Sequence, residues 1–214
     1  MKHLTSIFVF LLVPLALLAK PTYDELSNHT VYIEGKSDRG GYLGTGVVIQ
    51  RVGEYDYVLT NRHIADGALE LKIENLYRIA EIIAISDTVD LALLRVKNNN
   101  FNKTPVKGLR YPKIGDSVYT VGHGLGLPYN WGEGVVSGFV TVNNVTHLYL
   151  QLPSIGGQSG SGIFDNNGYL VGILWGGWLV PLNIFQSERD PRTCCVRGED
   201  IFMFLIENGI AFEE

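Results

Sequence analysis

Three polar residues stand in sequence contexts that suit nucleophilic catalysis: a histidine, an aspartate and a serine. His63 follows the apolar run 55–59, Asp90 comes directly before the apolar run 91–94, and Ser159 lies among glycines. A histidine can accept a hydroxyl proton and return it near neutral pH, because its ordinary pKa is about 6.5. A carboxylate beside it would hold the imidazole in one tautomer and stabilise its charged form. These residue types therefore predict acyl transfer by an activated serine.

The serine lies in the segment 156–162 (GGQSGSG). A serine nucleophile needs a tight turn that exposes its hydroxyl, and glycine reaches the required backbone conformations without steric cost. Such a turn can also direct backbone N–H groups at one point, where they bind the oxyanion of a tetrahedral intermediate. We expect the N–H groups of Gly157 and Ser159 to form this oxyanion hole. The segment runs directly into the apolar pair Ile163-Phe164, which argues against a flexible linker.

Each of the three residues also has an ordinary structural interpretation. A single histidine is most often structural, an aspartate commonly begins a strand, and a glycine-serine stretch can be a loop. The combination is more specific, because histidine, aspartate and serine occur in that order, separated by 27 and 69 residues. His123, which lies between two glycines after an apolar run, is an alternative base. The order and the turn together favour His63, Asp90 and Ser159.

The chain around these positions consists of short β-rich runs separated by Gly, Asn, Asp and Pro. About a dozen such runs predict an all-β protein, either a sandwich or a pair of barrels. The polar stretch 98–110 would separate a first half, residues 28–108, from a second half, residues 109–214. A cleft between the halves would then unite the three side chains. The expected strands are 30–34, 42–51, 55–60, 69–74, 78–86, 91–97, 117–122, 133–142, 147–152, 162–165, 169–176 and 193–197.

One short helix is expected near the C-terminus. Apolar residues recur at helical spacing at positions 201, 202, 205 and 206, and two acidic residues precede them. Asn208-Gly209 is a typical C-terminal stop. The helix would follow the last strand of the second half.

The composition argues against several other classes of function. The net charge is −5 and no cluster of Lys and Arg appears, whereas nucleic-acid-binding proteins carry a basic surface. The two cysteines, Cys194 and Cys195, are adjacent, so they offer neither a disulfide framework nor the ligand spacing of a metal site. We therefore expect no metal, no cofactor and no nucleic-acid partner.

The first 19 residues have the pattern of a secretory signal. Lys2 and His3 precede an uncharged apolar run, residues 4–18, and the small residue Ala19 follows it. We expect an exported protein, either periplasmic or secreted. The alternative is a membrane anchor formed by residues 4–18, although the run is shorter than the roughly 20 residues of a spanning helix. Only if this segment stays uncleaved would it provide a contact with the membrane.

Several segments together form a pattern known from one protein family. Residues 44–49 (GTGVVI), 57–63 (YVLTNRH) and 90–94 (DLALL) resemble its first barrel strand, its histidine segment and its aspartate segment. Residues 114–122 and 134–138 resemble the opening strands of its second barrel, and residues 157–161 (GQSGS) resemble its nucleophile turn. On these motifs, over about residues 30–208, the chain resembles the trypsin-like serine peptidases of the chymotrypsin fold. It is nearest to the Deg/HtrA and glutamyl-endopeptidase branches.

The resemblance implies two perpendicular six-stranded Greek-key β-barrels with a short C-terminal helix. It also implies a serine endopeptidase with protein or peptide substrates and no cofactor. His63, Asp90 and Ser159 would form its catalytic triad, and Gly157 and Ser159 its oxyanion hole. Gly162 departs from the family pattern, which usually has proline there. Only 55 residues follow Ser159, so we expect no PDZ module in this sequence.

The resemblance also indicates where the residue before the scissile bond would bind. In this family the pocket is lined by the segment before the nucleophile and by a strand that ends in Trp-Gly. No acidic residue lies there, and the histidine of glutamyl-specific relatives is missing, so we expect a preference for an aliphatic or small residue. An alternative function is a catalytically latent or non-enzymatic peptide-binding module on the same fold. The expected pocket residues are Ser154, Ile155, Gly156, Leu174, Trp175 and Gly176.

Overall fold

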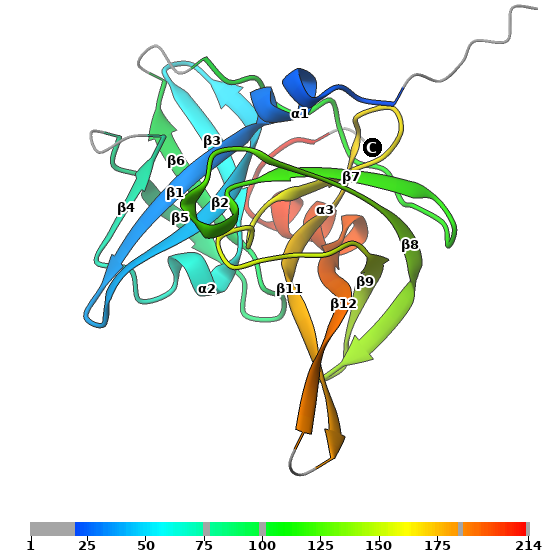
Figure 1. Cartoon of the computed structure of the whole chain (residues 1–214). Coiled ribbons are helices and arrows are strands. Elements are labelled where there is room, and N and C mark those ends of the chain that lie inside the picture. Colours follow the sequence, from blue (N-terminus) through cyan, green and yellow to red (C-terminus); the bar gives the residue numbers. More distant parts are fainter. Residues whose placement is uncertain (1–19, 75–77, 99–101, 184–185, 213–214) are drawn as a thin grey trace, which may run out of the picture.

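The computed structural model describes residues 20–74, 78–98, 102–183 and 186–212 of the chain (Figure 1). Residues 1–19, the predicted signal or anchor, lie outside the described residues. Two six-stranded β-sheets make up most of the described chain, and three short helices and a 3₁₀ turn accompany them. None of the helices in the described ranges is long and apolar enough to cross a membrane.

The first sheet has the strand order β4-β1-β2-β3-β6-β5, with antiparallel neighbours throughout. Successive residues on a strand point to opposite faces. On β2, Val48 faces the core of the first sheet, whereas Val47 and Ile49 face a second core that both sheets share. The strands are β1 (Thr30–Ser37), β2 (Gly40–Val52), β3 (Tyr55–Thr60), β4 (Glu70–Ile73), β5 (Glu81–Ile85) and β6 (Ala92–Lys97).

The second sheet closes into a barrel in the order β10-β11-β12-β9-β8-β7. Leu148, Leu150 and Ile163 are fully buried inside it, and the Cys195 side chain packs with them. The neighbouring Cys194 is also buried. The strands are β7 (Ser117–Gly122), β8 (Asn130–Val142), β9 (Val145–Gln151), β10 (Gly162–Phe164), β11 (Leu170–Asn183) and β12 (Gln186–Arg197).

Short helices occupy the ends and connections of the sheets. The predicted C-terminal helix is α3 (Gly198–Glu207), which packs against β11 and β12 and buries Ile201 and Leu205 in the shared core. The helix α1 (Tyr23–His29) precedes β1, and α2 (Arg62–Ala65) follows β3. The 3₁₀ turn η1 (Gly124–Gly126) lies between β7 and β8.

The predicted all-β fold with about a dozen strands and one C-terminal helix is confirmed, and each strand overlaps its predicted range. The second barrel is closed. In the first sheet β4 and β5 are the edges, and a bridge between Lys72 and Ile79 pairs β4 with the segment that leads into β5. The helices α1 and α2 were not predicted, because each is too short to show a helical period. The strands β11 and β12 extend beyond their predicted ends into a long hairpin (Figure 1).

Candidate active site

The ends of two neighbouring strands bring His63 and Asp90 together. Strand β3 ends at Thr60, which pairs with Ala92 at the start of β6. His63 lies three residues beyond this pair, on α2, and Asp90 lies two residues before it. Because the strands are antiparallel, the end of β3 and the start of β6 lie at the same end of the sheet, which brings the two residues together.

The Asp90 carboxylate binds both the side chain and the backbone of His63. Its Oδ2 lies 2.7 Å from Nδ1 of the imidazole, and its Oδ1 accepts the His63 backbone N–H at 2.9 Å. Asn61 donates its side-chain N–H to the Asp90 carbonyl oxygen at 3.0 Å. A carboxylate only accepts hydrogen bonds, so Nδ1 carries the proton and Nε2 is the acceptor nitrogen of the neutral ring.

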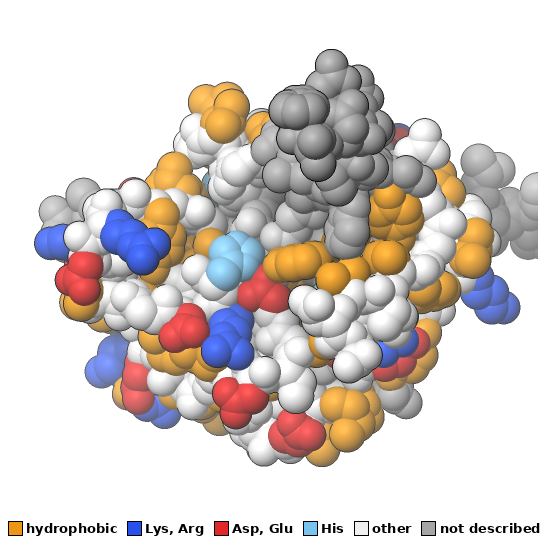
Figure 2. All heavy atoms as spheres, turned by 90° about the horizontal axis from the view of Figure 1, so that it is seen from below, with side chains coloured by type: hydrophobic (Ala, Val, Ile, Leu, Met, Phe, Trp, Pro, Cys, Tyr) orange, Lys and Arg blue, Asp and Glu red, His pale blue; other side chains and the backbone are white. Residues whose placement is uncertain are grey.

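The two groups differ in their access to water. The Asp90 side chain is 16% exposed, whereas that of His63 is 44% exposed. The imidazole can therefore meet a substrate while its orienting carboxylate stays largely covered. Figure 2 shows the face seen from below in Figure 1, where a histidine side chain lies at the surface between charged side chains and an apolar area.

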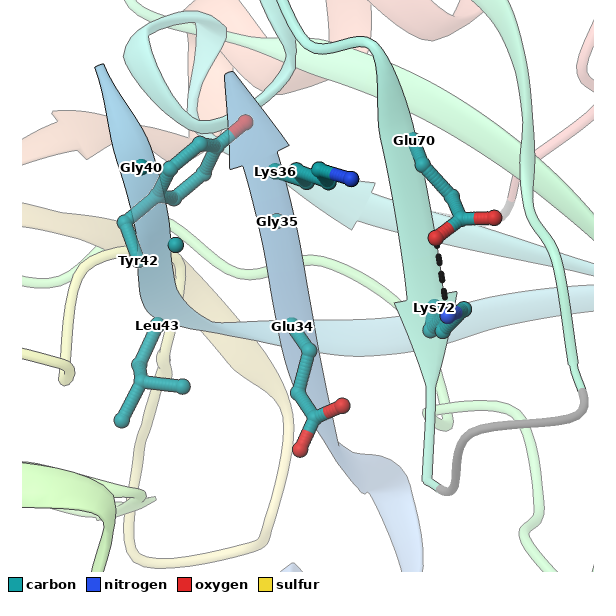
Figure 3. A pocket seen from close by; sticks show the side chains of 9 residues that line it. Glu34, Gly35, Lys36, Gly40, Tyr42, Leu43, Glu70 and Lys72 are labelled. Carbon is teal, nitrogen blue, oxygen red and sulfur yellow. Dashed lines mark ion pairs between the residues drawn. The ribbon is translucent and has the colours of Figure 1, made fainter. Parts of the chain in front are cut away.

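A tyrosine on β2 braces the helix that carries His63. The Tyr42 hydroxyl donates to the Ile64 carbonyl oxygen at 2.8 Å. A Cβ at Gly35 would overlap the Tyr42 ring, so only glycine leaves room for it on β1 (Figure 3). Tyr42 borders two hollows, one of about 390 Å³ over β1, β2 and β4 (Figure 3) and one of about 400 Å³ beside His63. The second is lined by Ser37, Asp38, Arg39, Tyr42, His63, Asp66 and Gly67.

The segment around Ser159 forms a tight turn at the start of β10, held against the first sheet. The Thr45 N–H of β2 donates to the Ser159 carbonyl oxygen at 2.8 Å, and the Gly160 N–H donates to the Leu174 carbonyl oxygen at 2.9 Å. Gly160 has a φ of +89°, and a Cβ there would overlap the Thr45 carbonyl. The predicted requirement for glycine is met at this position by both backbone conformation and close approach.

The Ser159 hydroxyl donates to the Trp175 carbonyl oxygen at 3.4 Å. This is long for an O–H···O bond, for which about 2.8 Å is usual. Among the described residues, no hydrogen bond joins Ser159 to His63, and neither the Gly157 nor the Ser159 N–H has an acceptor. The structure thus contains a carboxylate–imidazole pair, a serine in a tight turn and, beside it, two N–H groups that have no acceptor in the described part of the chain.

The predicted pocket residues have different surroundings. Ile155 is exposed and Trp175 is half-buried, with its ring stacked on His147 at a centroid distance of 4.9 Å. Leu174 is 1% exposed and its side chain packs in the core of the second barrel. Its side chain is therefore covered in this structure, and its place in the pocket stays a prediction. Gly156 is exposed, and Ser154 and Gly176 are half-buried.

The alternative base, His123, is buried. It is 2% exposed, and its ring packs against those of Tyr32 and Tyr129. Burial lowers its pKa to about 4, with a smaller contribution from the Lys103 ammonium. A ring in this position is neutral at pH 7 and hidden from substrate, so it cannot replace His63 as the base.

Sequence reasoning missed three polar side chains close to the site. Asn61 belongs to the histidine motif, but nothing in the pattern shows its bond to Asp90. His147 carries no motif, and its buried Nδ1 has no hydrogen-bond partner in the described part of the chain. Thr45 lies in the Gly-Thr-Gly segment, which indicated only a strand. Within the same described ranges, no group of three His, Cys, Asp or Glu side chains could hold a metal ion.

Comparison with known proteins agrees with this geometry. A family model described as a trypsin-like peptidase domain matches residues 44–173. The chain belongs to the trypsin-like peptidase family. The match begins on β2 and ends on β11, so it includes His63, Asp90 and the Ser159 turn.

Curated relatives of this trypsin-like peptidase domain include bacterial serine endoproteases. Serine endoprotease DegS of Haemophilus influenzae is 28% identical over 145 residues, which are 61% of this chain and 40% of that protein. A probable periplasmic serine endoprotease DegP-like of Halomonas elongata is 26% identical over 150 residues, 65% of this chain and 30% of that protein. The chain thus matches less than half the length of either relative.

Solved structures show the same fold at lower sequence identity. The Rv3671c protease of M. tuberculosis, in its active form, superposes with a TM-score of 0.73 at 18% identity, covering 100% of this chain and 97% of that one. The HtrA-type protease AlgW with tripeptide gives a TM-score of 0.68 at 18% identity, covering 89% of this chain and 65% of that one.

Proposed function

We propose that this chain is a serine endopeptidase that cleaves protein substrates through Ser159, His63 and Asp90. The observation that carries the proposal is the double hydrogen bond from His63 to Asp90, at 2.7 Å from Nδ1 and 2.9 Å from the backbone N–H. This contact assigns the proton to Nδ1 and leaves Nε2 as a base at the surface. Membership of the trypsin-like peptidase family and the glycine-rich Ser159 turn support the same reaction.

Acylation would begin when Nε2 of His63 takes the Ser159 hydroxyl proton while Oγ bonds to the substrate carbonyl carbon. The resulting oxyanion would accept the N–H groups of Gly157 and Ser159, which have no acceptor among the described residues. His63 would then give the proton to the amide nitrogen as the C–N bond breaks. Water would attack the acyl-enzyme by the same route in reverse, releasing the new carboxylate.

One movement must precede this reaction. The Ser159 hydroxyl donates to the Trp175 carbonyl oxygen, and it must turn from there to Nε2 of His63. The existing bond is long and therefore weak, so breaking it would cost little. Hydrogen bonds of catalytic groups are often loose before substrate binds and tighten in the complex.

The proposed substrate preference rests on the residues before the turn and on Trp175 of β11. Ile155, Gly156 and Trp175 are uncharged, and they are at least partly exposed. We propose that they favour an aliphatic or small residue before the scissile bond, because an apolar wall offers burial but no ion pair. We further propose that residues 1–19 direct export, the location that the name of the DegP-like relative gives for that protein.

A second candidate is a latent enzyme or a peptide-binding module on the same fold. The hydrogen bond from Ser159 to Trp175, in place of one to His63, favours it. In a latent enzyme, the hydroxyl would leave Trp175 only after a trigger such as assembly or peptide binding.

The two candidates differ in their reaction with a fluorophosphonate probe, which labels an activated serine. The full chain should be labelled at Ser159, and Ser159→Ala should remove both labelling and cleavage of a casein substrate. Ser161→Ala is the matched control, because Ser161 is a buried serine two residues away. Labelling of folded Ser159→Ala, or none of the folded wild type, would contradict the proposal of a constitutively active enzyme.

A further inference from the structure

Thr45, on β2 of the first sheet, contacts the nucleophile turn of the second barrel through both its backbone and its side chain. Its N–H donates to the Ser159 carbonyl oxygen at 2.8 Å, and its hydroxyl donates to the Gly157 carbonyl oxygen at 2.8 Å. The Thr45 carbonyl oxygen accepts the Thr60 hydroxyl at 2.7 Å, and Thr45 itself is fully buried. One residue thus binds the turn on both sides of Gln158.

The direction of the Thr45 hydroxyl proton follows from its neighbours. A hydroxyl has one proton and two lone pairs, and a carbonyl oxygen can only accept. The proton therefore points at Gly157 O, and a lone pair accepts the His123 backbone N–H at 3.1 Å. The His123 Nδ1 lies farther away, at 3.5 Å from the same oxygen. The hydroxyl is held in one orientation by a donor and an acceptor.

This hydroxyl holds one of the two peptide groups that flank Gly157. The other is the peptide from Gly156 to Gly157, whose carbonyl oxygen accepts the Leu125 N–H at 2.7 Å. In a trans peptide the N–H points opposite to the C=O, so the Gly157 N–H points away from Leu125. Gly157 has a φ of +96°, and a Cβ there would come within 2.5 Å of the His123 carbonyl oxygen. The Leu125 hydrogen bond therefore sets the direction of the Gly157 N–H, and the Thr45 hydrogen bond fixes the next peptide group, from Gly157 to Gln158, on the other side of the same Cα.

We propose that Thr45 is a positioning residue that keeps the Gly157 N–H directed into the oxyanion hole. This inference rests on the proposed endopeptidase function. Without the hydroxyl, the Gly157 carbonyl loses its partner and the peptide groups around a glycine can rotate. The Ser159 N–H should keep its place, because the carbonyl oxygen of its own peptide group, that of Gln158, still accepts the Ser161 N–H at 3.0 Å. The loss should fall on one oxyanion donor, and a lost donor typically lowers kcat about 10²- to 10³-fold.

The test compares Thr45→Val, which keeps the shape and removes the hydroxyl, with Thr45→Ser, which keeps the hydroxyl. Thr120→Val is the matched control, because Thr120 is also fully buried and donates at 2.8 Å to the Gly162 carbonyl oxygen. We expect kcat for a peptide ester to fall about 10- to 100-fold in Thr45→Val, less than for a removed donor because the Gly157 N–H is displaced and not lost, with KM within about threefold. Thr45→Ser and Thr120→Val should stay within about threefold of wild type. All rates are divided by the active sites counted in a prolonged phosphonate titration.

A second measurement isolates the oxyanion hole from general effects on folding. A peptide aldehyde adds to the serine and places an oxyanion in the hole, whereas the corresponding peptide amide binds without bond formation. The ratio of the amide inhibition constant to the aldehyde inhibition constant should fall toward one in Thr45→Val, by the same factor by which kcat falls. In Thr120→Val this ratio should stay unchanged. If Thr45→Val does not fold, Thr45→Ala and Thr120→Ala provide the same comparison.

Three results would overturn the role of Thr45 in an active wild type. They are unchanged turnover of Thr45→Val per titrated site, an equal loss in Thr120→Val, or a loss in Thr45→Ser as large as in Thr45→Val. A folded wild type that neither hydrolyses the ester nor reacts with phosphonate would instead refute the endopeptidase function, and the role of Thr45 with it.

Discussion

Replacing Asp90 by asparagine exchanges one oxygen for an NH₂ group and keeps the shape of the side chain. In the wild-type protein the Asp90 carboxylate accepts two N–H groups, that of the His63 backbone and that of the His63 Nδ1. An asparagine can accept only one of these two through its single oxygen. Its amide must therefore choose between two orientations, and the choice decides whether His63 can act as a base.

In the first orientation the amide oxygen keeps the backbone N–H, and the NH₂ group faces Nδ1. The imidazole must then carry its proton on Nε2, where it cannot accept the Ser159 proton. In the second orientation the ring keeps its tautomer, but the NH₂ group faces the backbone N–H. An unsatisfied donor of this kind costs about 1–3 kcal/mol, which is a factor of about 5 to 150 in population.

The lost charge adds a second effect, because a neutral amide stabilises the imidazolium less than a carboxylate does. Hydrogen bonds to charged groups contribute about 1.5–3 kcal/mol, against about 1 for neutral pairs. The two effects together predict a loss of about 10- to 5 × 10³-fold in kcat for Asp90→Asn.

The assay is ester hydrolysis by the folded variant, with the rate of phosphonate labelling as a second readout. Asp87→Asn is the control, because it removes the same charge from an exposed side chain three residues away. It should keep wild-type turnover. A folded Asp90→Asn protein within tenfold of wild type at pH 7 would refute the assignment of Asp90 as the residue that orients His63.

Two further predictions concern stability. Burial lowers the pKa of His123 to about 4, so between pH 6.5 and 4 the unfolded chain binds a proton that the folded one does not. The contribution of neutral His123 to the free energy of unfolding is thus fully present above pH 6.5, and about 3 kcal/mol of it is lost as the pH falls to 4. In urea unfolding, His123→Asn should lack this part of the pH dependence. A variant whose free energy of unfolding falls with pH as steeply as that of the wild type would contradict the prediction. Arg51→Met should lower the free energy of unfolding by about 3 kcal/mol, because it leaves the fully buried Asp56 carboxylate without the two hydrogen bonds, of 2.6 and 2.9 Å, that Arg51 donates to it. Arg95→Met should change little, because the partner of Arg95, Glu81, is largely exposed, and equal losses in the two variants would refute the reasoning.

The sequence was most informative where a strand has a clear period and a turn at each end. Strands β3 and β7 begin and end at the predicted residues, 55–60 and 117–122, because apolar runs there meet polar turn residues directly. The end of β11 was missed, because Gly176-Gly177 has the composition of a turn. In the structure these glycines continue the strand into the hairpin with β12.

At the site, motifs indicated which residues matter but not how they touch. His63 and Asp90 make the contact that their motifs predict. The catalytic roles of these residues stay a prediction. The burial of Leu174 depends on which face of β11 turns inward, and a continuously apolar run carries no period to reveal it. The side-chain bond from Thr45 to Gly157 joins residues 112 positions apart, so local composition holds no trace of it.

The core shared by the two sheets restricts how a substrate could enter. Val47 and Leu59 of the first sheet pack in one cluster with Val121 and Phe164 of the second, and Ile201 of α3 completes it. A closely packed interior does not deform continuously, so a hinge between the sheets would have to open voids throughout this cluster. Admission and release of a peptide therefore fall to loops and side-chain rotations at the surface. The two halves of the candidate active site should also lose their alignment only when the whole domain unfolds, so that enzymatic activity would serve as a direct reporter of folding.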